Sequence, residues 1–548
     1  MNLKSVFALI FTHLVSQAIT QCNPYFKSPL SSRPTYYNID AQLDESTKQI
    51  KASQSIQYIN QSKVAIHELR FYMYLNAFKN TNSTFLKGTT NIFGQTLANR
   101  KSDEWGWIDI QDLYITQKQI QYDLQNKFKY ISLDDGNESD QTVLQVELEK
   151  EILPGDTATI ELNWMAKMPK TIIRAGYNQD FYLFCHWFPQ LGVFEESIEG
   201  KWQWNCHQFF RATEFYADFG VYDVNITVNK KFIIGASGCL ISEQTNKDNT
   251  ITRKYHAEDV IDFTWAINTD CKVIEDRWRN TQIRILLPND YSNLTERYRF
   301  ILKFALEYLD VHVGSYPYPI ITVVCPPFHA LRSGLMEYPT LITTGSFYKM
   351  PTGIRTTESL LVHEFVHQYF MGMVASNEKE EPWLDEGFAT YFEDRIIDAA
   401  YGKKKSLIDI LGFHLDNREL TRSEYTGMKN PSEGIVARPA WEFSQSNHKS
   451  LIYSKTASTL HSIQNIIGED QIDNIIQTYF NKWKFKHPRG QDLMSAFNVE
   501  LKKMKDTSLA HMTYQLLEQS IYQAHSLDYR VVQISNDLAS HSQGIYGI

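Results

Sequence analysis

Clusters of basic residues are missing from this 548-residue sequence, in which 54 Lys and Arg residues are outnumbered by 63 Asp and Glu residues and the formal net charge is −9. Proteins that follow a phosphate backbone need a positive surface, so nucleic acid is not an expected partner. Beyond the N-terminus no stretch approaches the roughly 18 apolar residues that cross a bilayer, and the last residues do not resemble a lipid-anchor tail. Internal repeats and low-complexity linkers are also absent. These absences favour a soluble protein without a transmembrane segment.

Apolar and aromatic residues, in contrast, are plentiful. Hydrophobic residues make up 43% of the chain and aromatic residues 13%, with 31 Tyr, 31 Phe and 11 Trp. This content excludes a disordered chain and predicts a globular body. At roughly 150 residues per domain, the length suits several domains.

Residues 1–18 have the layout of a cleavable secretory signal. Lys4 precedes the apolar stretch Ser5–Val15, and small residues follow at positions 16 and 18. A buried N-terminal strand is the alternative interpretation. Cleavage would leave a mature chain that begins near residue 19 or 21. We therefore expect a secreted protein, either extracellular or in the lumen of the secretory pathway.

Sequons and cysteines agree with export. Five asparagines stand in N-x-S/T sequons, and six cysteines allow up to three disulfides. The Cys-His pairs at 185–186 and 206–207 are poor zinc sites, because neighbouring strand residues point to opposite faces. We expect a Cys185–Cys206 disulfide, with two free buried thiols as the alternative. The sequon asparagines are Asn60, Asn82, Asn137, Asn225 and Asn293, and the cysteines are Cys22, Cys185, Cys206, Cys239, Cys271 and Cys325.

From residue 35 to about 270, polar and apolar residues alternate with the period of two that is typical of strands. Residues 144–148 and 158–164 alternate on either side of a Pro-Gly-Asp turn at 154–156, which predicts a half-buried hairpin. Residues 222–228 alternate as well and place Asn225 on the polar face, where a glycan is tolerated. We interpret residues 19–272 as one large antiparallel β domain without chemistry of its own.

After about residue 277 the apolar residues repeat with helical spacing, first at Tyr298, Ile301, Leu302, Ala305 and Leu309. A strand is predicted at 320–324, a helix at 358–371, a second helix from about 386 and further helices to about 517. The predicted fold class is therefore multidomain α+β, with the β domain followed by a mixed α/β domain at 273–525 whose C-terminal part is helical. Residues 526–548 are a tail.

His363, Glu364 and His367 form an H-E-x-x-H motif on the helix predicted at 358–371. Residues four apart lie above one another on a helix, so both imidazoles reach one tetrahedral metal while Glu364 projects beside it. The alternative is a surface helix whose two histidines form ordinary hydrogen bonds and bind no metal. Eighteen residues separate His367 from Glu386, which opens the second helix and is a candidate third ligand that leaves one position open for water.

The segments HEFVHQYF and WLDEGFATYFE around these ligands resemble the gluzincin zinc aminopeptidases, the aminopeptidase N family. Two further segments resemble motifs of that family in the right order, GLMEY at 334–338 and YSKT at 453–456. In appearance the chain is most similar to secreted bacterial-type members with a short C-terminal region. The resemblance spans roughly residues 35–520 and implies a thermolysin-like catalytic domain. Three residues depart from the family pattern, Tyr338, Asp385 and Thr456, and they leave substrate preference open.

The resemblance implies that one Zn²⁺ per chain is held by His363, His367 and Glu386. It further implies that Glu337 binds the free amino group of the substrate and that Tyr453 stabilises the oxyanion. Gly334 and Met336 belong to the same substrate-binding segment as Glu337. Glu364 is the expected base and then acid, because its carboxylate lies beside the activated water.

The expected function is therefore zinc-dependent removal of the N-terminal residue from peptides with a free N-terminus. A zinc endopeptidase, in which Glu337 is structural, and a non-catalytic secreted binding protein are the alternatives. Glu393 is a candidate for orienting a ligand histidine, or else a solvated surface residue. Neither the preferred N-terminal residue nor the oligomeric state is indicated by the sequence.

Overall fold

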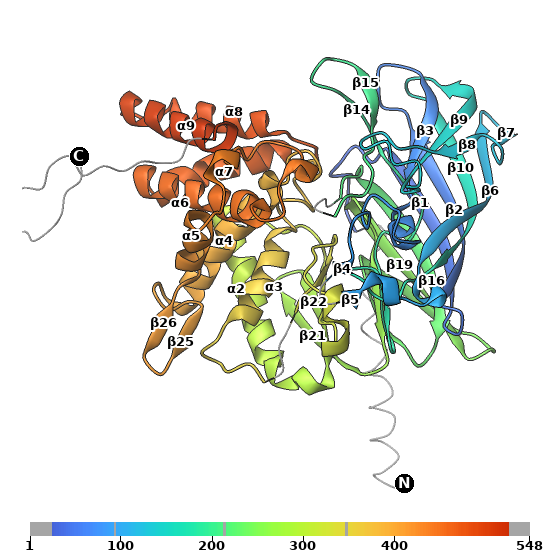
Figure 1. Cartoon of the computed structure of the whole chain (residues 1–548), viewed down its shortest axis with the longest axis horizontal. Coiled ribbons are helices and arrows are strands. Elements are labelled where there is room, and N and C mark those ends of the chain that lie inside the picture. The colour runs from blue at the N-terminus through green and yellow to red at the C-terminus, as the bar shows by residue number, and fades with distance from the viewer. Residues whose placement is uncertain (1–24, 93–94, 212–214, 346–348, 525–548) are drawn as a thin grey trace, which may run out of the picture.

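The computed structural model describes residues 25–92, 95–211, 215–345 and 349–524. The predicted signal, the tail at 526–548 and Cys22 lie outside the described residues. A β-rich part formed by the first half of the chain stands beside a mainly helical second part (Figure 1). The expected α+β architecture is thus confirmed. No helix among the described residues is both long and apolar enough to cross a membrane.

The largest sheet of the N-terminal part has eight strands. Neighbouring strands in this sheet are antiparallel, with one exception. The strand that starts at Thr35 runs parallel to the strand that starts at Gly220. Buried and exposed residues alternate along its strands because one face packs inward and the other meets solvent. In spatial order the strands are β18 (Cys239–Thr245), β19 (Thr250–Val260), β16 (Gly220–Asn229), β1 (Thr35–Asp44), β2 (Gln49–Ile59), β10 (Thr157–Lys167), β6 (Trp107–Gln117) and β7 (Ile120–Asp123).

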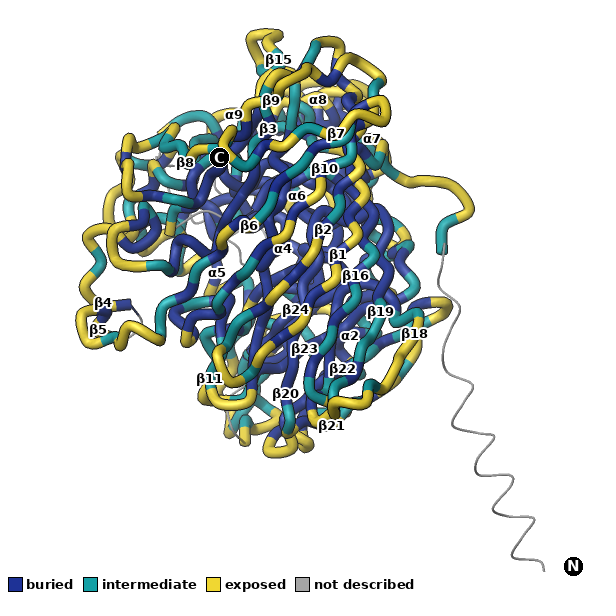
Figure 2. Tube along the Cα trace, turned by 90° about the vertical axis from the view of Figure 1, so that its right-hand side faces the viewer, coloured by how far each residue is buried: buried dark blue, intermediate teal, exposed yellow. Residues whose placement is uncertain are grey.

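Smaller sheets complete the N-terminal part, and the interior between the sheets is buried, as the dark trace in Figure 2 shows. One sheet contains β11 (Gly176–Asn178), β12 (Phe181–Phe184), β20 (Trp265–Asn268) and β17 (Ile233–Ala236), and another contains β13 (Gln190–Leu191), β3 (Ile66–Tyr72), β9 (Val143–Ile152) and β8 (Phe128–Tyr130). Two-stranded ribbons are β14 (Val193–Glu196) with β15 (Trp202–Asn205), and β4 (Asn91–Ile92) with β5 (Gln95–Thr96).

The prediction of a hairpin around residues 154–156 is wrong. The strands on either side of this turn, β9 and β10, do not pair with each other but belong to different sheets. The turn is held by Asn60, whose N–H donates to Asp156 O over 3.0 Å and whose carbonyl accepts from Gly155 N over 2.8 Å. The chain therefore crosses here from one sheet to the other, because the turn bonds to Asn60 and each strand finds a partner distant in sequence.

The second part begins with a four-stranded sheet of β21 (Cys271–Trp278), β22 (Thr281–Pro288), β23 (Ile320–Val324) and β24 (Leu341–Thr343). The predicted domain boundary at 272/273 falls inside β21, whose first residue already pairs with β22. The strand predicted at 320–324 is confirmed as β23. The longer helices are α2 (Thr295–His312), α3 (Thr356–Val366), α4 (Trp383–Tyr401), α5 (Asn417–Thr426), α6 (Thr456–Ile467), α7 (Glu469–Trp483), α8 (Gly490–Leu501) and α9 (Thr507–Tyr522).

Short helices and one hairpin connect these elements. The hairpin consists of β25 (Ile408–Ile410) and β26 (Phe413–Leu415), and a π-helix, η8 (Ser450–Lys455), precedes α6. The 3₁₀ helices are η1 (Tyr74–Phe78), η2 (Leu97–Asn99), η3 (Ser102–Glu104), η4 (Asn289–Leu294), η5 (Phe328–Ser333), η6 (Pro431–Glu433) and η7 (Ala440–Glu442).

A charged segment just before α4 anchors the second part to the β domain. Lys379 is fully buried, with its ammonium 4.1 Å from the ring centre of Tyr72, and it donates a 3.0 Å hydrogen bond to the carbonyl of His207. Glu380 contacts the His207 ring at 3.1 Å and accepts from Asn205 at 3.0 Å. Lys379 and Glu380 thus each have polar or aromatic partners in the β domain. The β domain thereby fixes the start of α4.

The expected Cys185–Cys206 disulfide is wrong. Cys185 and Cys206 are both buried, and each has a free thiol. Cys206 packs tightly on Gly192, whereas burial next to Tyr338 raises the pKa of the Cys185 thiol to about 12, so the two sulfurs face different neighbours. Burial raises the pKa of Cys206 to about 12 as well, which makes both thiols poor nucleophiles.

The five sequons differ in exposure. Asn82 and Asn293 are exposed, and Asn225 is half-buried on the polar face of β16. Asn60 and Asn137 are buried, and their side-chain amides donate to the carbonyls of Ile152 and Asn82, each over 2.8 Å. Glycan attachment to the two buried asparagines would break these hydrogen bonds.

Candidate active site

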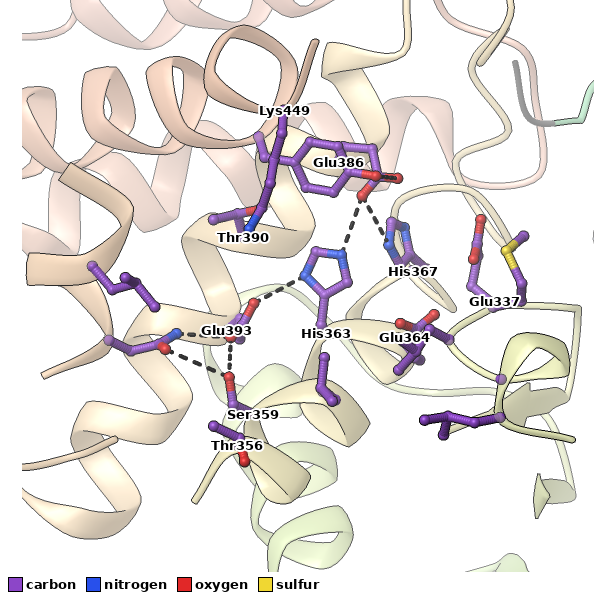
Figure 3. A pocket seen from close by; sticks show the side chains of 18 of the residues that line it. Glu337, Thr356, Ser359, His363, Glu364, His367, Glu386, Thr390, Glu393 and Lys449 are labelled. Carbon is purple, nitrogen blue, oxygen red and sulfur yellow. Dashed lines mark hydrogen bonds and ion pairs between the residues drawn. The ribbon is translucent and has the colours of Figure 1, made fainter. Parts of the chain in front are cut away.

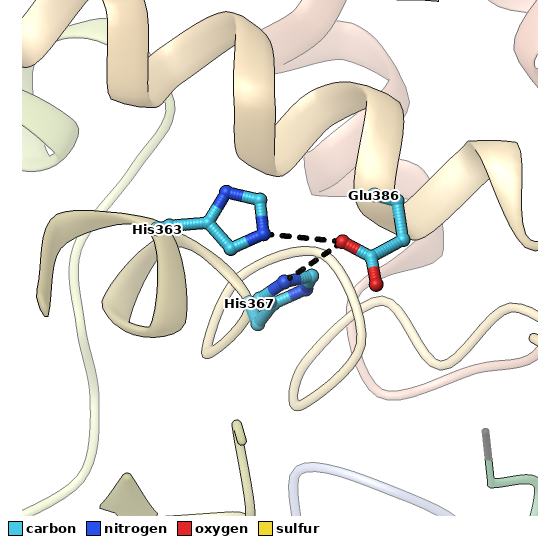
Figure 4. Close-up of side chains that lie close together, drawn as sticks. All are labelled: His363, His367 and Glu386. Atoms are coloured by element: carbon cyan, nitrogen blue, oxygen red, sulfur yellow. Dashed lines mark hydrogen bonds and ion pairs between the residues drawn. The ribbon is translucent and has the colours of Figure 1, made fainter. Parts of the chain in front are cut away.

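Two helices bring the three expected ligands together. His363 lies near the end of α3, His367 is its C-cap and Glu386 lies in the first turn of α4 (Figure 4). The helix predicted at 358–371 therefore ends earlier, at Val366, but the N–H of His367 still bonds to the carbonyl of His363 over 3.4 Å. This last turn keeps the two imidazoles on one side of the helix, facing α4.

The ligand atoms of the three residues converge on one point. Glu386 Oε2 lies 3.1 Å from His363 Nε2 and 3.4 Å from His367 Nε2, and the three ligand atoms all lie within 4.8 Å of one another. Two imidazoles and one carboxylate are the donor set of catalytic zinc sites of the His₂Glu type. Burial opposes the ionisation of Glu386, but the two imidazoles outweigh it and lower the pKa of this carboxyl.

In each ligand histidine, the ring nitrogen Nδ1, which does not face Glu386, contacts a further carboxylate. His363 Nδ1 lies 3.0 Å from Glu393, which also accepts from Asn417 at 2.8 Å and from Ser359. Asp385 accepts a short hydrogen bond from His367 Nδ1. Such contacts fix the ring orientation and leave Nε2 directed at the metal. Glu393 is therefore placed as the orienting residue that its position suggested, and Asp385 has the same role for the second histidine.

The charge around the site fits a divalent cation. Five carboxyl groups meet two imidazoles, so with all groups ionised the net charge is 2 − 5 = −3, and the guanidinium of Arg174 near Glu337 makes it −2. Burial opposes protonation of His363, yet hydrogen bonds with Glu386 and Glu393 raise its pKa to about 10. When all of these groups are ionised, the five carboxylates around the ligands thus outnumber the three cationic groups beside them. The carboxyl groups are those of Glu337, Glu364, Asp385, Glu386 and Glu393.

Glu364 and Glu337 flank His367 and do not take part in the ion pairs drawn between ligands (Figure 3). Glu364 is 4% exposed, and burial above all raises its pKa well above the ordinary range, with Glu337 adding to the effect. Glu337 is 3% exposed and its Oε1 has no hydrogen-bond partner among the described residues. Burial also raises the pKa of Glu337. A desolvated carboxyl group with an unpaired oxygen is suited to bind a cationic ligand group.

The segment that carries Glu337 is a bent strand edge. Leu335 has a φ of +63°, and Met336 bridges to Thr343 of β24. A Cβ atom at Gly334 would lie 2.5 Å from the carbonyl oxygen of Thr344, so only glycine fits there. Gly334 and Met336 thereby fix the path of the backbone that presents Glu337 to the cavity.

Tyr453 lies on the π-helix η8, and its hydroxyl donates a short hydrogen bond to Glu386 Oε1. Its ring stacks on His363 with the ring centres 5.9 Å apart. Extra-wide helical turns of this kind are frequent at functional sites because they redirect one side chain. The phenol is therefore held at the edge of the ligand set.

A cavity of about 1030 Å³ is lined by the three ligands and by Glu337, Glu364, Glu393 and Tyr453. One end is lined by Ile173 and Arg174 of the β domain and by η5, and the other end by α5, His448 and Lys449. Arg174 comes from a segment distant in sequence, and no local pattern marked it. Lys449 pairs with Glu424 at 2.6 Å at the other end. The sequence did not indicate that Arg174 or Lys449 belongs to the site, because both join it only in the folded chain.

Two of the three departures from the family pattern have clear structural surroundings. Tyr338 is buried away from the ligands, with its ring centre 5.8 Å from that of His186 and 6.1 Å from that of Phe215. Thr456 fills the space over Gly387, where a Cβ atom would lie 2.2 Å from its methyl group. Neither residue reaches the ligand atoms, whereas Asp385 does so through His367.

Comparisons with known proteins agree with this geometry. Residues 296–514 match the peptidase family M1 domain. The chain carries an M1 peptidase domain. The match contains all eight residues that the sequence placed in the site.

Among curated proteins, glutamyl aminopeptidase of Bos taurus is 26% identical over 258 residues, which cover 44% of this chain and 26% of the relative. Leucine aminopeptidase 2 of Chaetomium globosum is 30% identical over 171 residues, 30% of this chain and 26% of the relative. The aligned part thus spans about a quarter of these relatives.

Among solved structures, a variant of the M1 zinc metallopeptidase from Deinococcus radiodurans has a TM-score of 0.59 at 13% identity and covers 92% of this chain and 97% of its own. Another structure of a variant of that protein, bound to a Tyr-Ser-Ala substrate, has a TM-score of 0.57 at 13% identity, with the same coverage. These likenesses extend the fold assignment from the M1 domain to the β domain.

Proposed function

We propose that this protein is a zinc-dependent aminopeptidase that removes the N-terminal residue from peptides. The observation that carries the proposal is the buried carboxyl group of Glu337, whose Oε1 lacks a partner among the described residues beside a His₂Glu donor set. A free α-ammonium group would pair with this oxygen and place the first peptide bond over the ligands.

One zinc ion per chain would be held by His363, His367 and Glu386. When bound, zinc polarises the scissile carbonyl and lowers the pKa of a water molecule toward neutrality. Asp385 and Glu393 hold the protons on Nδ1 of the two imidazoles, so that each Nε2 lone pair stays directed at the ion.

Glu364 would accept a proton from the attacking water and deliver it to the leaving amine. The raised pKa of this buried carboxyl suits both steps, since a less acidic carboxyl group accepts a proton more readily and can then pass it to the leaving amine. Tyr453 would donate a hydrogen bond to the oxyanion, because its hydroxyl already lies at the edge of the ligand set.

The names of the relatives support aminopeptidase chemistry, and they include a glutamyl and a leucine aminopeptidase. The cavity beside Glu337 is lined by apolar side chains and by Arg174. The layout of residues 1–18 and the two exposed sequons at Asn82 and Asn293 support export of the protein.

A zinc endopeptidase is the second candidate, favoured by the size of the cavity, which continues beyond Tyr453 to Lys449. A panel of amino-acid anilides, measured with and without a zinc chelator, separates the candidates. An aminopeptidase cleaves several anilides and loses activity on chelation. An endopeptidase cleaves none of them but cleaves internal bonds of a longer peptide, and a binding protein cleaves neither.

A further inference from the structure

The hairpin of β25 and β26 projects from the second part of the molecule, below α5 in Figure 1. Its tip is apolar and exposed, since Leu411 is 104% and Phe413 61% exposed. Most exposed apolar side chains lie singly on a flat surface and need no explanation. Two large ones at the end of a projecting hairpin are different, because neither stabilises the fold by burial.

The conformation of the tip does not require these residues either. Leu411 and Gly412 both have positive φ, +50° and +83°, which is the pattern of a two-residue type I′ turn. Such turns favour Asn-Gly or Asp-Gly, and a leucine at positive φ is strained. Leu411 therefore costs stability in the turn and gains none from packing. A residue that violates the local preference without a compensating contact points to a role outside the fold.

Positive charge is concentrated in the segment that leads into this hairpin. Lys403, Lys404 and Lys405 are all exposed, and residues 402–415 carry three lysines against one aspartate, a net charge of 3 − 1 = +2 in a chain of net charge −9. Asp409 is already engaged by Lys405 at 3.4 Å and by His414 at 3.1 Å. Neither Lys403 nor Lys404 has an ion-pair partner among the described residues.

The neighbouring surface has the same character. Arg355 donates to the carbonyl of Lys405 over 2.8 Å, and its guanidinium lies 4.4 Å from the ring centre of Tyr401. The Tyr401 ring in turn contacts Phe300 of α2, which is 49% exposed, at 5.9 Å between ring centres. The half-buried pair of Arg355 and Tyr401 thus connects the hairpin to the exposed ring of Phe300 on α2.

We propose that residues 402–415, together with Phe300, form a docking surface for an anionic lipid bilayer. Leu411 and Phe413 would enter the boundary between headgroups and acyl chains, and the three lysines would face the negative headgroups. This combination of a shallow apolar anchor and basic residues is how peripheral proteins bind membranes, and neither element suffices alone.

Charge and size argue against other occupants. In a symmetric dimer formed through the tip, Lys403 and Lys404 would face their own copies, and like charges across an interface are unfavourable. Two side chains at a hairpin tip also offer far less than the roughly 800 Å² per partner of a stable protein interface. A bilayer needs no matching surface and supplies the complementary charge.

Docking in this way would hold the cavity close to the membrane. Leu407 and Asn417, which lie immediately before and after the hairpin, both line the cavity. The hairpin is therefore a direct extension of the cavity wall.

Sedimentation with vesicles tests the proposal. The full chain is mixed with vesicles of neutral phosphatidylcholine or of phosphatidylcholine with about 30% phosphatidylserine, in low and high salt. The double variant Leu411→Asn, Phe413→Gln keeps a favourable turn and creates no sequon. Ile198→Asn is the matched control, because Ile198 is an 86% exposed residue in the loop between β14 and β15.

We expect binding to the anionic vesicles only, weakened by salt, reduced at least about tenfold by the double variant and left unchanged by Ile198→Asn. Lys403→Glu with Lys404→Glu should also reduce binding. Thermal unfolding of each variant controls for misfolding. Absence of vesicle binding by the wild type, binding that the double variant retains, or a dimer in sedimentation velocity that the double variant abolishes would each overturn the proposal. All of these readouts are independent of peptidase activity.

Discussion

Two histidines, the buried His256 of the β domain and the partly buried His363 of the site, have nearly the same surroundings and different consequences. In the β domain His256 lies between Asp223 at 2.9 Å and Glu258 at 2.8 Å. In the site His363 lies between Glu393 at 3.0 Å and Glu386 at 3.1 Å. Burial opposes the protonation of each ring, but the carboxylates raise the pKa of His256 to about 9 and that of His363 to about 10.

The difference lies in the charges that surround each pair of carboxylates. The β-domain cluster contains Arg33, which bonds Glu258 at 2.8 Å and Asp259 at 2.5 Å. Lys254 lies 3.9 Å from Asp223, so these two cations and the protonated His256 balance the three carboxylates. Among the described residues, the site has no such arginine between its ligands, and Glu337 and Asp385 each keep an oxygen without a hydrogen-bond partner. A histidine between carboxylates is therefore not by itself a sign of function. Uncompensated negative charge with unpaired oxygens is the sign that separates the site from a structural cluster.

The largest effect is expected from removal of the base, Glu364. Glu364→Gln takes one carboxylate from the charged site without touching a ligand, so zinc should remain bound while kcat falls at least about 100-fold. Zinc content by metal analysis and anilide hydrolysis measure the two effects. Loss of the metal together with the activity would instead make Glu364 part of the ligand set.

Tyr453→Phe removes a single hydrogen-bond donor and leaves every charge in place. We expect kcat to fall by about 100-fold with little change in KM, because the lost interaction forms in the transition state. Steady-state kinetics on one anilide give both constants. Wild-type turnover in this variant would show that the phenol does not assist the reaction.

Asp385→Asn tests whether the carboxylate behind His367 matters for the metal. The amide keeps a hydrogen-bond acceptor but lacks the charge, so zinc affinity should fall by about tenfold. Competition with a chromophoric chelator gives the affinity without any assay of activity. His256→Gln is the matched control in the β domain and should leave zinc affinity unchanged.

The β-domain cluster should be visible in the pH dependence of stability. The folded-state pKa of His256, about 9, is above the ordinary value of about 6.5, so the contribution of the cluster is complete below pH 6.5 and is lost as the pH rises through 9. Between pH 6 and 9.5 the wild type should lose roughly 1–3 kcal/mol more of its unfolding free energy than His256→Gln. Urea unfolding at both pH values measures this, and parallel losses in the two proteins would contradict it.

Local spacing was sufficient to predict the ligands and several elements. His363, His367 and Glu386 are linked by helix geometry, and the five apolar residues predicted for one face of α2 are all buried. Partners distant in sequence were harder to predict. The pairing of β9 and β10 with other strands depends on which strands neighbour them in the folded domain, and alternation alone does not encode it. Three other features also depend on the folded chain and were not predicted. They are the position of Arg174 in the cavity, the separate surroundings of Cys185 and Cys206, and the π-helix that carries Tyr453.

The most direct test of the account concerns Glu337. Its unpaired buried oxygen is the feature that distinguishes an aminopeptidase from an endopeptidase here, since an acetylated substrate would leave the carboxylate desolvated without a partner. The measurement is kcat/KM for one peptide, free and N-acetylated, on the wild type and on Glu337→Ala at equal zinc content. We predict a preference of the wild type for the free peptide of at least about 100-fold, which the variant loses because its activity on the free peptide falls. Comparable cleavage of both forms by the wild type would contradict the account and return Glu337 to a structural role.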